Sequence, residues 1–133
     1  MSKKVYVYIV DDDHDDREIL RDAFISAGFN LDFILLESGD SLQQHLNDHM
    51  NEMPPALIML DLNMPGKDGR ETLKYIKSNK KYFQIPIIIF TTSSSPRDKS
   101  LAYDLGANCF ITKPDTFSKL QELVVCIFKL WLG

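Results

Sequence analysis

Acidic, hydroxyl and basic side chains each directly follow a short apolar segment of this chain. The residues in these positions are Asp11, Asp12, Asp61, Thr91 and Lys113. If the apolar segments are parallel strands of one sheet, their carboxyl ends lie along one edge, which is where open α/β sheets form their sites. The spacing therefore predicts a single site that gathers carboxylates, a hydroxyl and an ammonium group.

Several carboxylates at one edge of a sheet need a counter-charge. Two carboxylates about 5 Å apart repel each other by about 3 kcal/mol at an effective dielectric constant of about 20. Capping of a helix start explains the acids within 13–16, but it does not explain why Asp11 and Asp12 should face Asp61. Such a cluster is either partly protonated or binds a cation. Because the candidate ligands are all oxygens and the site is open to water, we predict Mg²⁺ rather than Ca²⁺.

A divalent cation beside Asp61, with a hydroxyl and a lysine opposite, suits phosphoryl transfer. A carboxylate can act as the nucleophile and become an acyl phosphate. The transfer then depends mainly on positioning and on neutralising the phosphoryl charge. Mg²⁺ and Lys113 would neutralise that charge, while Thr91 and the backbone N–H groups of the turn at 63–64 would donate hydrogen bonds.

Five apolar segments alternate with amphipathic stretches along the chain. We expect strands at 5–10, 33–36, 56–60, 85–90 and 109–112. The segments 56–60 and 85–90 do not alternate with polar residues, as expected for strands buried on both faces of a parallel sheet. We expect helices before Gly28 and at 40–50, 68–78, 96–105 (closed by Gly106) and 117–132. This alternation predicts a three-layer α/β sandwich with right-handed crossovers.

The composition bounds the class of protein. With 133 residues, of which 44% are hydrophobic and 26% charged, the chain fits one globular domain and not a disordered or fibrous protein. A net charge of −4 argues against nucleic acid or an anionic membrane as a partner, and no apolar run reaches the about 18 residues of a membrane span. We expect a cytoplasmic protein with a single domain over 1–133 and no output domain. Its two cysteines, Cys109 and Cys126, are expected to be reduced and mostly buried.

Four short motifs, in order and each at a strand end, resemble those of the response regulator receiver domains of two-component signalling. They are VDD at 10–12, DLNMPGKDG at 61–69, PIIIFTT at 86–92 and TKP at 112–114. The resemblance extends over essentially the whole chain. It implies a flavodoxin-like, doubly wound parallel sheet of five strands in the order 2-1-3-4-5, with five helices in a three-layer α/β/α arrangement.

The resemblance also implies roles for individual residues. Asp61 would accept a phosphoryl group from the phosphohistidine of a histidine kinase or phosphotransfer protein. Asp12 would be the main Mg²⁺ ligand, with Asp11 acting through water, and Asn63 would offer its backbone carbonyl to the metal. The chain would then be a phosphoacceptor and not an enzyme, apart from catalysing its own phosphotransfer and autodephosphorylation.

Three further positions match the parts of the family that respond to phosphorylation. Thr91 matches the switch hydroxyl, Lys113 the lysine that pairs with the phosphate, and Phe110 the switch aromatic that swings inward. The other interpretation of Phe110 is ordinary core packing in both states. The Lys113–Pro114 bond is often cis in this family, and the sequence does not show which isomer is present here.

Other phosphate-handling families fit less well. Haloacid-dehalogenase-type phosphatases have a second Asp as general acid where this chain has Asn63, which carries no titratable proton. The acids at 11–13 would repel the phosphate of FMN in a flavodoxin, and no P-loop motif is present. The alternative left open is an adaptor with a receiver fold that works without phosphorylation. His45 and His49 lie four apart and could bind a metal, but without a third ligand we favour a solvated helix face.

The final helix is apolar over a wide arc. Trp131 lies on the main apolar stripe of 117–132, and the apolar residues Val125 and Leu130 lie outside that stripe. Together with Tyr103 they predict an interface formed by the fourth helix, the fifth strand and the fifth helix. Details of the sequence resemble single-domain receivers that partner phytochrome-type histidine kinases, which implies a homodimer through this face and kinase docking near the first helix and the loop after the fifth strand.

Overall fold

The computed structural model describes residues 4–64 and 69–133, and its strands form one parallel sheet in the order β2-β1-β3-β4-β5. The strands are β1 (Tyr6–Val10), β2 (Asp32–Leu36), β3 (Pro55–Leu60), β4 (Ile87–Thr91) and β5 (Cys109–Thr112). The helices are α1 (His14–Ser26), α2 (Gly39–His49), α3 (Gly69–Lys77), α4 (Pro96–Asp104) and α5 (Phe117–Ile127), followed by a π-helical segment, η1 (Phe128–Leu132). Residues 65–68, within the predicted 61–69 motif and at the predicted start of α3, lie outside the described residues.

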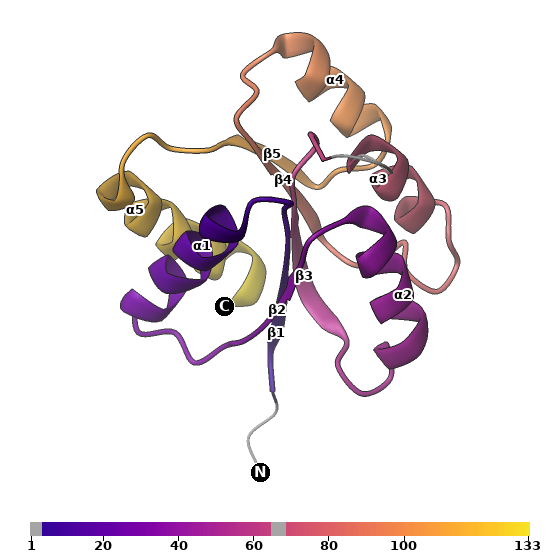
Figure 1. The fold of residues 1–133 in the computed structure, drawn as a ribbon, viewed down its shortest axis with the longest axis horizontal. Coiled ribbons are helices and arrows are strands. Elements are labelled where there is room, and N and C mark those ends of the chain that lie inside the picture. The colour runs from indigo at the N-terminus through magenta and orange to yellow at the C-terminus, as the bar shows by residue number, and fades with distance from the viewer. Residues whose placement is uncertain (1–3, 65–68) are drawn as a thin grey trace.

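Helices cover both faces of the sheet (Figure 1), so the predicted three-layer, flavodoxin-like fold is confirmed. Helices α1 and α5 lie on one face, and α2, α3 and α4 lie on the other. Each face buries its own apolar cluster, one centred on Phe24 and Val124 and the other on Leu46 and Leu73. The described residues contain no helix that is long and apolar enough to cross a membrane.

Element boundaries differ from the sequence expectation where backbone hydrogen bonds decide them. The fourth strand begins at Ile87 and not at 85, because Pro86 has no N–H to donate to a neighbouring strand. The predicted helix 117–132 is α-helical only to Ile127, and its last five residues form η1. Gly28 and Gly106 follow α1 and α4 with positive φ angles, as predicted for helix-terminating glycines.

The two cysteines are free, as expected, but they are less buried than predicted. Cys109 is half-buried beside the α1/α5 cluster, and Cys126 is exposed on α5. The sequence pattern misled here because Cys126 lies among apolar neighbours on a helix whose buried stripe is Leu120, Val124 and Ile127.

Candidate functional site

Strand register brings the predicted site residues to one edge of the sheet. Val10 of β1 pairs with Leu60 of β3, so the residues that follow them, Asp11 and Asp61, leave the sheet side by side. Thr91 pairs with Thr112 at the ends of β4 and β5, and Lys113 comes next. The structure therefore gathers side chains that are up to 102 positions apart in the chain.

Lys113 is the cationic centre of this edge. Its Nζ lies 2.6 Å from Oδ2 of Asp11, 2.9 Å from Oδ2 of Asp16 and 3.5 Å from Oδ2 of Asp61. The lysine side chain is only 12% exposed, and those of Asp11 and Asp61 are 7% and 9% exposed. Poor solvation strengthens the attraction of Lys113 to Asp11 and Asp61 relative to a surface pair, whereas the Asp16 side chain is 41% exposed.

Burial and ion pairing act in opposite directions on the ionisation of this cluster. Burial tends to lower the pKa of Lys113, but the hydrogen bonds from its ammonium group to Asp11 and Asp16 outweigh it, so the pKa lies above its usual value. Burial raises the pKa of Asp11, and the hydrogen bonds from Lys113 and from the backbone N–H of Asp13 offset only part of that rise. Lys113 therefore stays cationic at neutral pH.

Three carboxylates are placed where a cation would fit. Asp11, Asp12 and Asp61 can each offer an oxygen within 4.8 Å of the others. Asp12 is exposed, whereas Asp11 and Asp61 are buried, so the cluster opens to solvent on one side. An all-oxygen donor set that is open to water matches the preference of Mg²⁺, and these residues fit such an ion.

The backbone around Asp61 holds its carboxylate in place. Its N–H donates to the Val10 carbonyl at 3.0 Å, and its Oδ1 accepts the N–H of Asn63 at 3.2 Å. Gly69, at the start of α3, packs against this turn so closely that a Cβ there would lie 2.2 Å from the Asp61 carbonyl oxygen and 2.6 Å from the Leu62 Cα. The glycine of the predicted motif is thus required by close packing behind the site.

Thr91 and Lys113 are joined through the backbone. Thr91 is fully buried, its carbonyl accepts the N–H of Lys113 at 2.7 Å, and its hydroxyl accepts the N–H of Ser93 at 3.5 Å. All described peptide bonds are trans, including Lys113–Pro114, whose isomer the sequence did not show.

Two residues of α1 belong to the site although their roles were not predicted. Asp16, expected to serve only as a helix-start acid, bonds Lys113. Arg17 donates from Nη1 to the Asp11 carbonyl at 2.6 Å and so anchors the acidic loop. Their spacing from Asp11 gave no signal, because the direction in which α1 leaves the loop decides which of its side chains face the sheet edge.

The predicted switch aromatic is half-buried. Phe110 packs against the cluster on the α2/α3/α4 face, and its backbone N–H donates to the hydroxyl of Tyr103 on α4 at 3.1 Å. The position is therefore neither fully core nor fully exposed. Tyr103 and Leu130 of the predicted interface are 42% and 78% exposed. Val125 and Trp131 are half-buried, and Trp131 packs against the α1/α5 cluster.

The histidines on α2 are half-buried, so the predicted solvated face is only partly solvated, with the His49 side chain 41% exposed. The rings of His45 and His49 lie 4.7 Å apart between centroids, and His45 meets the Tyr8 ring edge-on at 5.2 Å. Burial, followed by the neighbouring His49, lowers the pKa of His45. Within the described residues, neither histidine joins a group of three possible metal ligands.

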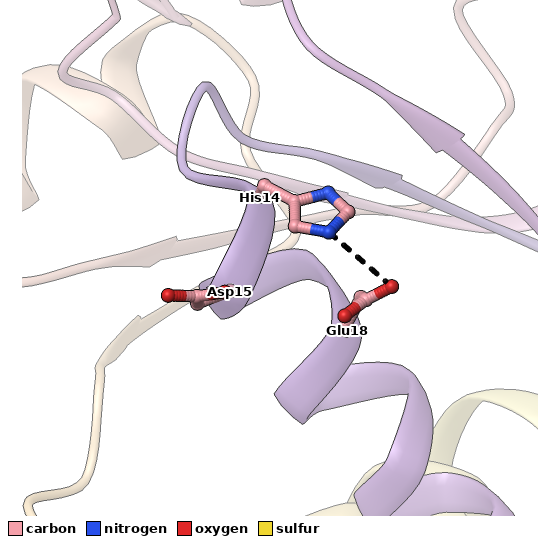
Figure 2. A group of neighbouring side chains, drawn as sticks. All are labelled: His14, Asp15 and Glu18. Atoms are coloured by element: carbon pink, nitrogen blue, oxygen red, sulfur yellow. Dashed lines mark ion pairs between the residues drawn. The ribbon is translucent and has the colours of Figure 1, made fainter.

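A second group of ligand-type side chains lies on the first turns of α1 (Figure 2). His14, Asp15 and Glu18 could each place a ligand atom within 4.8 Å of the others, and the ring of His14 faces Glu18 at 3.4 Å. His14 and Asp15 are exposed. This group therefore has the character of a surface ion pair, which contributes little energy.

Comparisons with known proteins agree with the geometry of the site. Residues 7–125 match the sequence profile of the response regulator receiver domain. Response regulator Rcp1 of Synechocystis sp. is 33% identical over 129 residues, which cover 95% of this chain and 88% of Rcp1.

Solved structures share the fold over nearly the whole chain. The phosphorylated cyanobacterial phytochrome response regulator RcpA has a TM-score of 0.90 and 32% identity, covering 98% of this chain and 96% of RcpA. The Mn²⁺-bound form of Rcp1 has a TM-score of 0.86 and 32% identity, covering 97% and 95% of the two chains. On sequence and structure alike, this chain belongs to the response regulator receiver domain family.

Proposed function

We propose that Asp61 accepts a phosphoryl group from the phosphohistidine of a sensor histidine kinase or phosphotransfer protein. The observation that supports this most strongly is the contact of the buried Lys113 ammonium with both Asp11 and Asp61 at an open sheet edge. A carboxylate nucleophile beside a fixed cation and a candidate metal site is what phosphoryl transfer requires. Members of this family are phosphoacceptor signalling domains and not enzymes that turn over an external substrate, and sensor histidine kinases are their partners.

The transfer is a displacement at phosphorus. An Asp61 carboxylate oxygen forms the new O–P bond while the N–P bond of the phosphohistidine breaks, and the leaving imidazole nitrogen keeps the electron pair and takes a proton from solvent. Lys113 pairs with the phosphoryl oxygens, and the N–H of Asn63 lies close enough to Asp61 to donate to one of them. Hydrolysis reverses the modification when water attacks the acyl phosphate, which is the autodephosphorylation that we expect.

Mg²⁺ is the cofactor that we propose for this site. Asp11, Asp12 and Asp61 would hold it together with the backbone carbonyl of Asn63, and the ion would supply charge neutralisation for the incoming phosphoryl group. The similar protein Rcp1 has been crystallised in a Mn²⁺-bound form, which supports a divalent cation with oxygen ligands.

Phosphorylation would be read out through Thr91 and Phe110. The Thr91 hydroxyl has only a long contact with the N–H of Ser93, so it is available to turn toward a phosphoryl group on Asp61. That movement opens space on the α4 side, into which the half-buried Phe110 ring can move. Because the Phe110 ring has no hydroxyl, its movement changes the shape of the α4–β5 surface and not its hydrogen bonding.

A hollow of about 260 Å³ beside the site suits the docking of a helical partner. It lies between α1 and the start of α5, and its apolar wall includes Ile19 and Phe117, which are 44% and 45% exposed. Lys113 also lines it, so a partner seated there reaches the edge of the phosphoacceptor site. The similar protein RcpA is a cyanobacterial phytochrome response regulator, which supports a phytochrome-type kinase, and we propose such a kinase as the partner in a cytoplasmic pathway.

We propose a homodimer through the α4–β5–α5 face, with Tyr103, Val125 and Leu130 at its core. Trp131, which the sequence predicts there, instead packs against the α1/α5 cluster near the start of β1. Leu130 is the most exposed of the large apolar side chains among the described residues. Sedimentation velocity should show a dimer that Leu130→Asp converts to a monomer. A wild-type monomer both with and without phosphorylation would exclude the dimer.

Incubation with acetyl phosphate and Mg²⁺, followed by intact-protein mass spectrometry, tests the proposed function. We expect the wild type to gain the mass of one phosphoryl group and Asp61→Asn to gain none, while Asp15→Asn, a matched change of an exposed acid, should behave as the wild type. Absence of the adduct in the wild type would favour the alternative, an adaptor that works without phosphorylation.

A further inference from the structure

An ion pair ties α3 to the start of α4 next to the site. Arg70, on the first turn of α3, donates from Nη2 to Oδ1 of Asp98 at 3.1 Å. The other carboxylate oxygen of Asp98 accepts the hydroxyl of Ser93 at 2.7 Å. The two side chains of the ion pair are 29% and 24% exposed, so the contact is partly shielded from water. We refer to Arg70, Asp98 and Ser93 as the α3–α4 latch.

The latch controls the loop that follows Thr91. The Ser93 hydroxyl also accepts the N–H of Ser95, the residue that caps α4, and the Ser93 carbonyl accepts the hydroxyl of Thr112 on β5. The Ser93 N–H is the group that donates to the Thr91 hydroxyl. Both the side chain and the backbone of Ser93 therefore make hydrogen bonds. Through them Ser93 contacts α4, β5 and Thr91, and through Asp98 it is linked to Arg70 of α3.

We propose that Asp98, held by Arg70, is a positioning residue that keeps Ser93 and Thr91 in their unphosphorylated arrangement and so opposes phosphoryl retention on Asp61. This rests on the proposed function of Asp61. The Ser93 N–H lies 3.5 Å from the Thr91 hydroxyl, so the loop that carries Ser93 has to adjust when this hydroxyl turns toward a phosphoryl group on Asp61, and the latch holds that loop in place. Weakening the latch lets the loop follow Thr91, which stabilises the phosphorylated state.

The same residues explain why the Ser93 hydroxyl does not serve the phosphoacceptor site directly. Its hydrogen bonds with Asp98 and with the N–H of Ser95 hold it at the start of α4. The hydrogen bonds from Ser93 and from Arg70 lower the pKa of Asp98, so the carboxylate is ionised at neutral pH and the latch is present there. Movement of Thr91 is in this way coupled to the cap of α4, the helix that carries Tyr103.

The proposal is tested with beryllofluoride, which mimics the phosphoryl group, in the presence of Mg²⁺. We expect Asp98→Asn and Arg70→Gln each to bind it about 3- to 10-fold more tightly than the wild type, measured by ¹⁹F NMR. The double variant should equal the stronger single variant, because both changes break the Arg70–Asp98 ion pair. Arg70→Lys should retain most of the wild-type affinity, and Arg21→Gln, which breaks an exposed Arg–Asp pair on α1, should not change it.

A structural defect would give a different result. General loosening of the fold would weaken Mg²⁺ and beryllofluoride binding together, whereas loss of the latch leaves Mg²⁺ affinity unchanged and tightens only beryllofluoride. Wild-type or weaker beryllofluoride binding in both single variants, or additive effects in the double variant, would overturn the proposal. Failure of the wild type itself to bind beryllofluoride would instead contradict the proposed function.

Discussion

The acidic edge of the sheet and the histidine pair of α2 are both clusters of ionisable side chains, but their surroundings differ. At the edge, Lys113 contacts Asp11, Asp16 and Asp61, and the exposed Asp12 leaves one side open to solvent. On α2, His45 and His49 lie against each other, and the buried Nε2 of His45 makes no hydrogen bond within residues 4–64 and 69–133. At the edge, ion pairing keeps Lys113 cationic, whereas on α2 burial lowers the pKa of His45 and disfavours its charged form.

The difference shows how to distinguish ionisable side chains that form a functional site from those that serve in packing. Carboxylates held beside a fixed cation at an open edge can bind a further cation and receive a phosphoryl group. On α2, burial lowers the pKa of His45 and so disfavours its charged form, and its ring packs edge-on against Tyr8 as a flat, partly apolar side chain. The regions differ in how their charges are partnered: at the edge the poorly exposed Lys113 meets three carboxylates, whereas on α2 His49 faces the exposed Glu52 at 3.5 Å.

The largest effect is expected from removing the cation of the acidic edge. Lys113→Met should slow phosphorylation by acetyl phosphate by about 100- to 1,000-fold, because no fixed charge then meets the developing charge on the phosphoryl oxygens. Stopped-flow or timed mass spectrometry measures the rate. Lys119→Met, which removes an exposed lysine paired with Asp115 at 3.0 Å, is the matched control and should leave the rate unchanged. Equal phosphorylation rates in the two variants would show that Lys113 takes no part in phosphoryl transfer.

A smaller but clear effect is expected behind Asp61. Gly69→Ala should lower the free energy of unfolding by about 1–3 kcal/mol and impair phosphorylation, because the new Cβ would displace the Asp61 carbonyl. Urea unfolding measures the first effect and mass spectrometry the second. Gly28→Ala, at a positive φ with open space around it, should cost about 1 kcal/mol without any loss of phosphorylation. A phosphorylation defect in Gly28→Ala would show that the assay reports stability alone.

The smallest effect is expected on α2 and concerns pH. The folded-state pKa of His45 lies below the ordinary value of 6.5, so the unfolded chain binds its proton more readily. Its contribution to stability is therefore fully present above about pH 6.5 and is lost as the pH falls through the lower folded-state value. Urea midpoints between pH 7.5 and pH 5 should show this decline, and it should be weaker in His45→Gln than in His14→Gln. A slope that His45→Gln leaves unchanged would assign the decline to other groups.

Much of the site was predictable because strand ends are readable in a sequence. Apolar runs mark the strands, and parallel register brings the residues that follow them to one edge, which places Asp11, Asp61, Thr91 and Lys113 correctly. The family motifs also implied the strand order 2-1-3-4-5, which the structure has.

Contacts made by helix side chains were not predictable in the same way. Asp16 and Arg17 face the site, and Arg70 reaches Asp98, only because of how α1, α3 and α4 pack against the sheet. The burial of His45 depends on the same tertiary packing, since a helical pattern alone does not show which face meets the sheet.

Chemical trapping of the modified residue tests the central claim most directly. After reaction with acetyl phosphate and Mg²⁺, borohydride reduces an aspartyl phosphate to homoserine, and peptide mass spectrometry then identifies the reduced position. We predict homoserine at position 61 and at no other carboxylate. Homoserine at position 11, 12 or 16 with Asp61 unmodified, or no reduced residue in protein that has gained a phosphoryl group, would contradict the account.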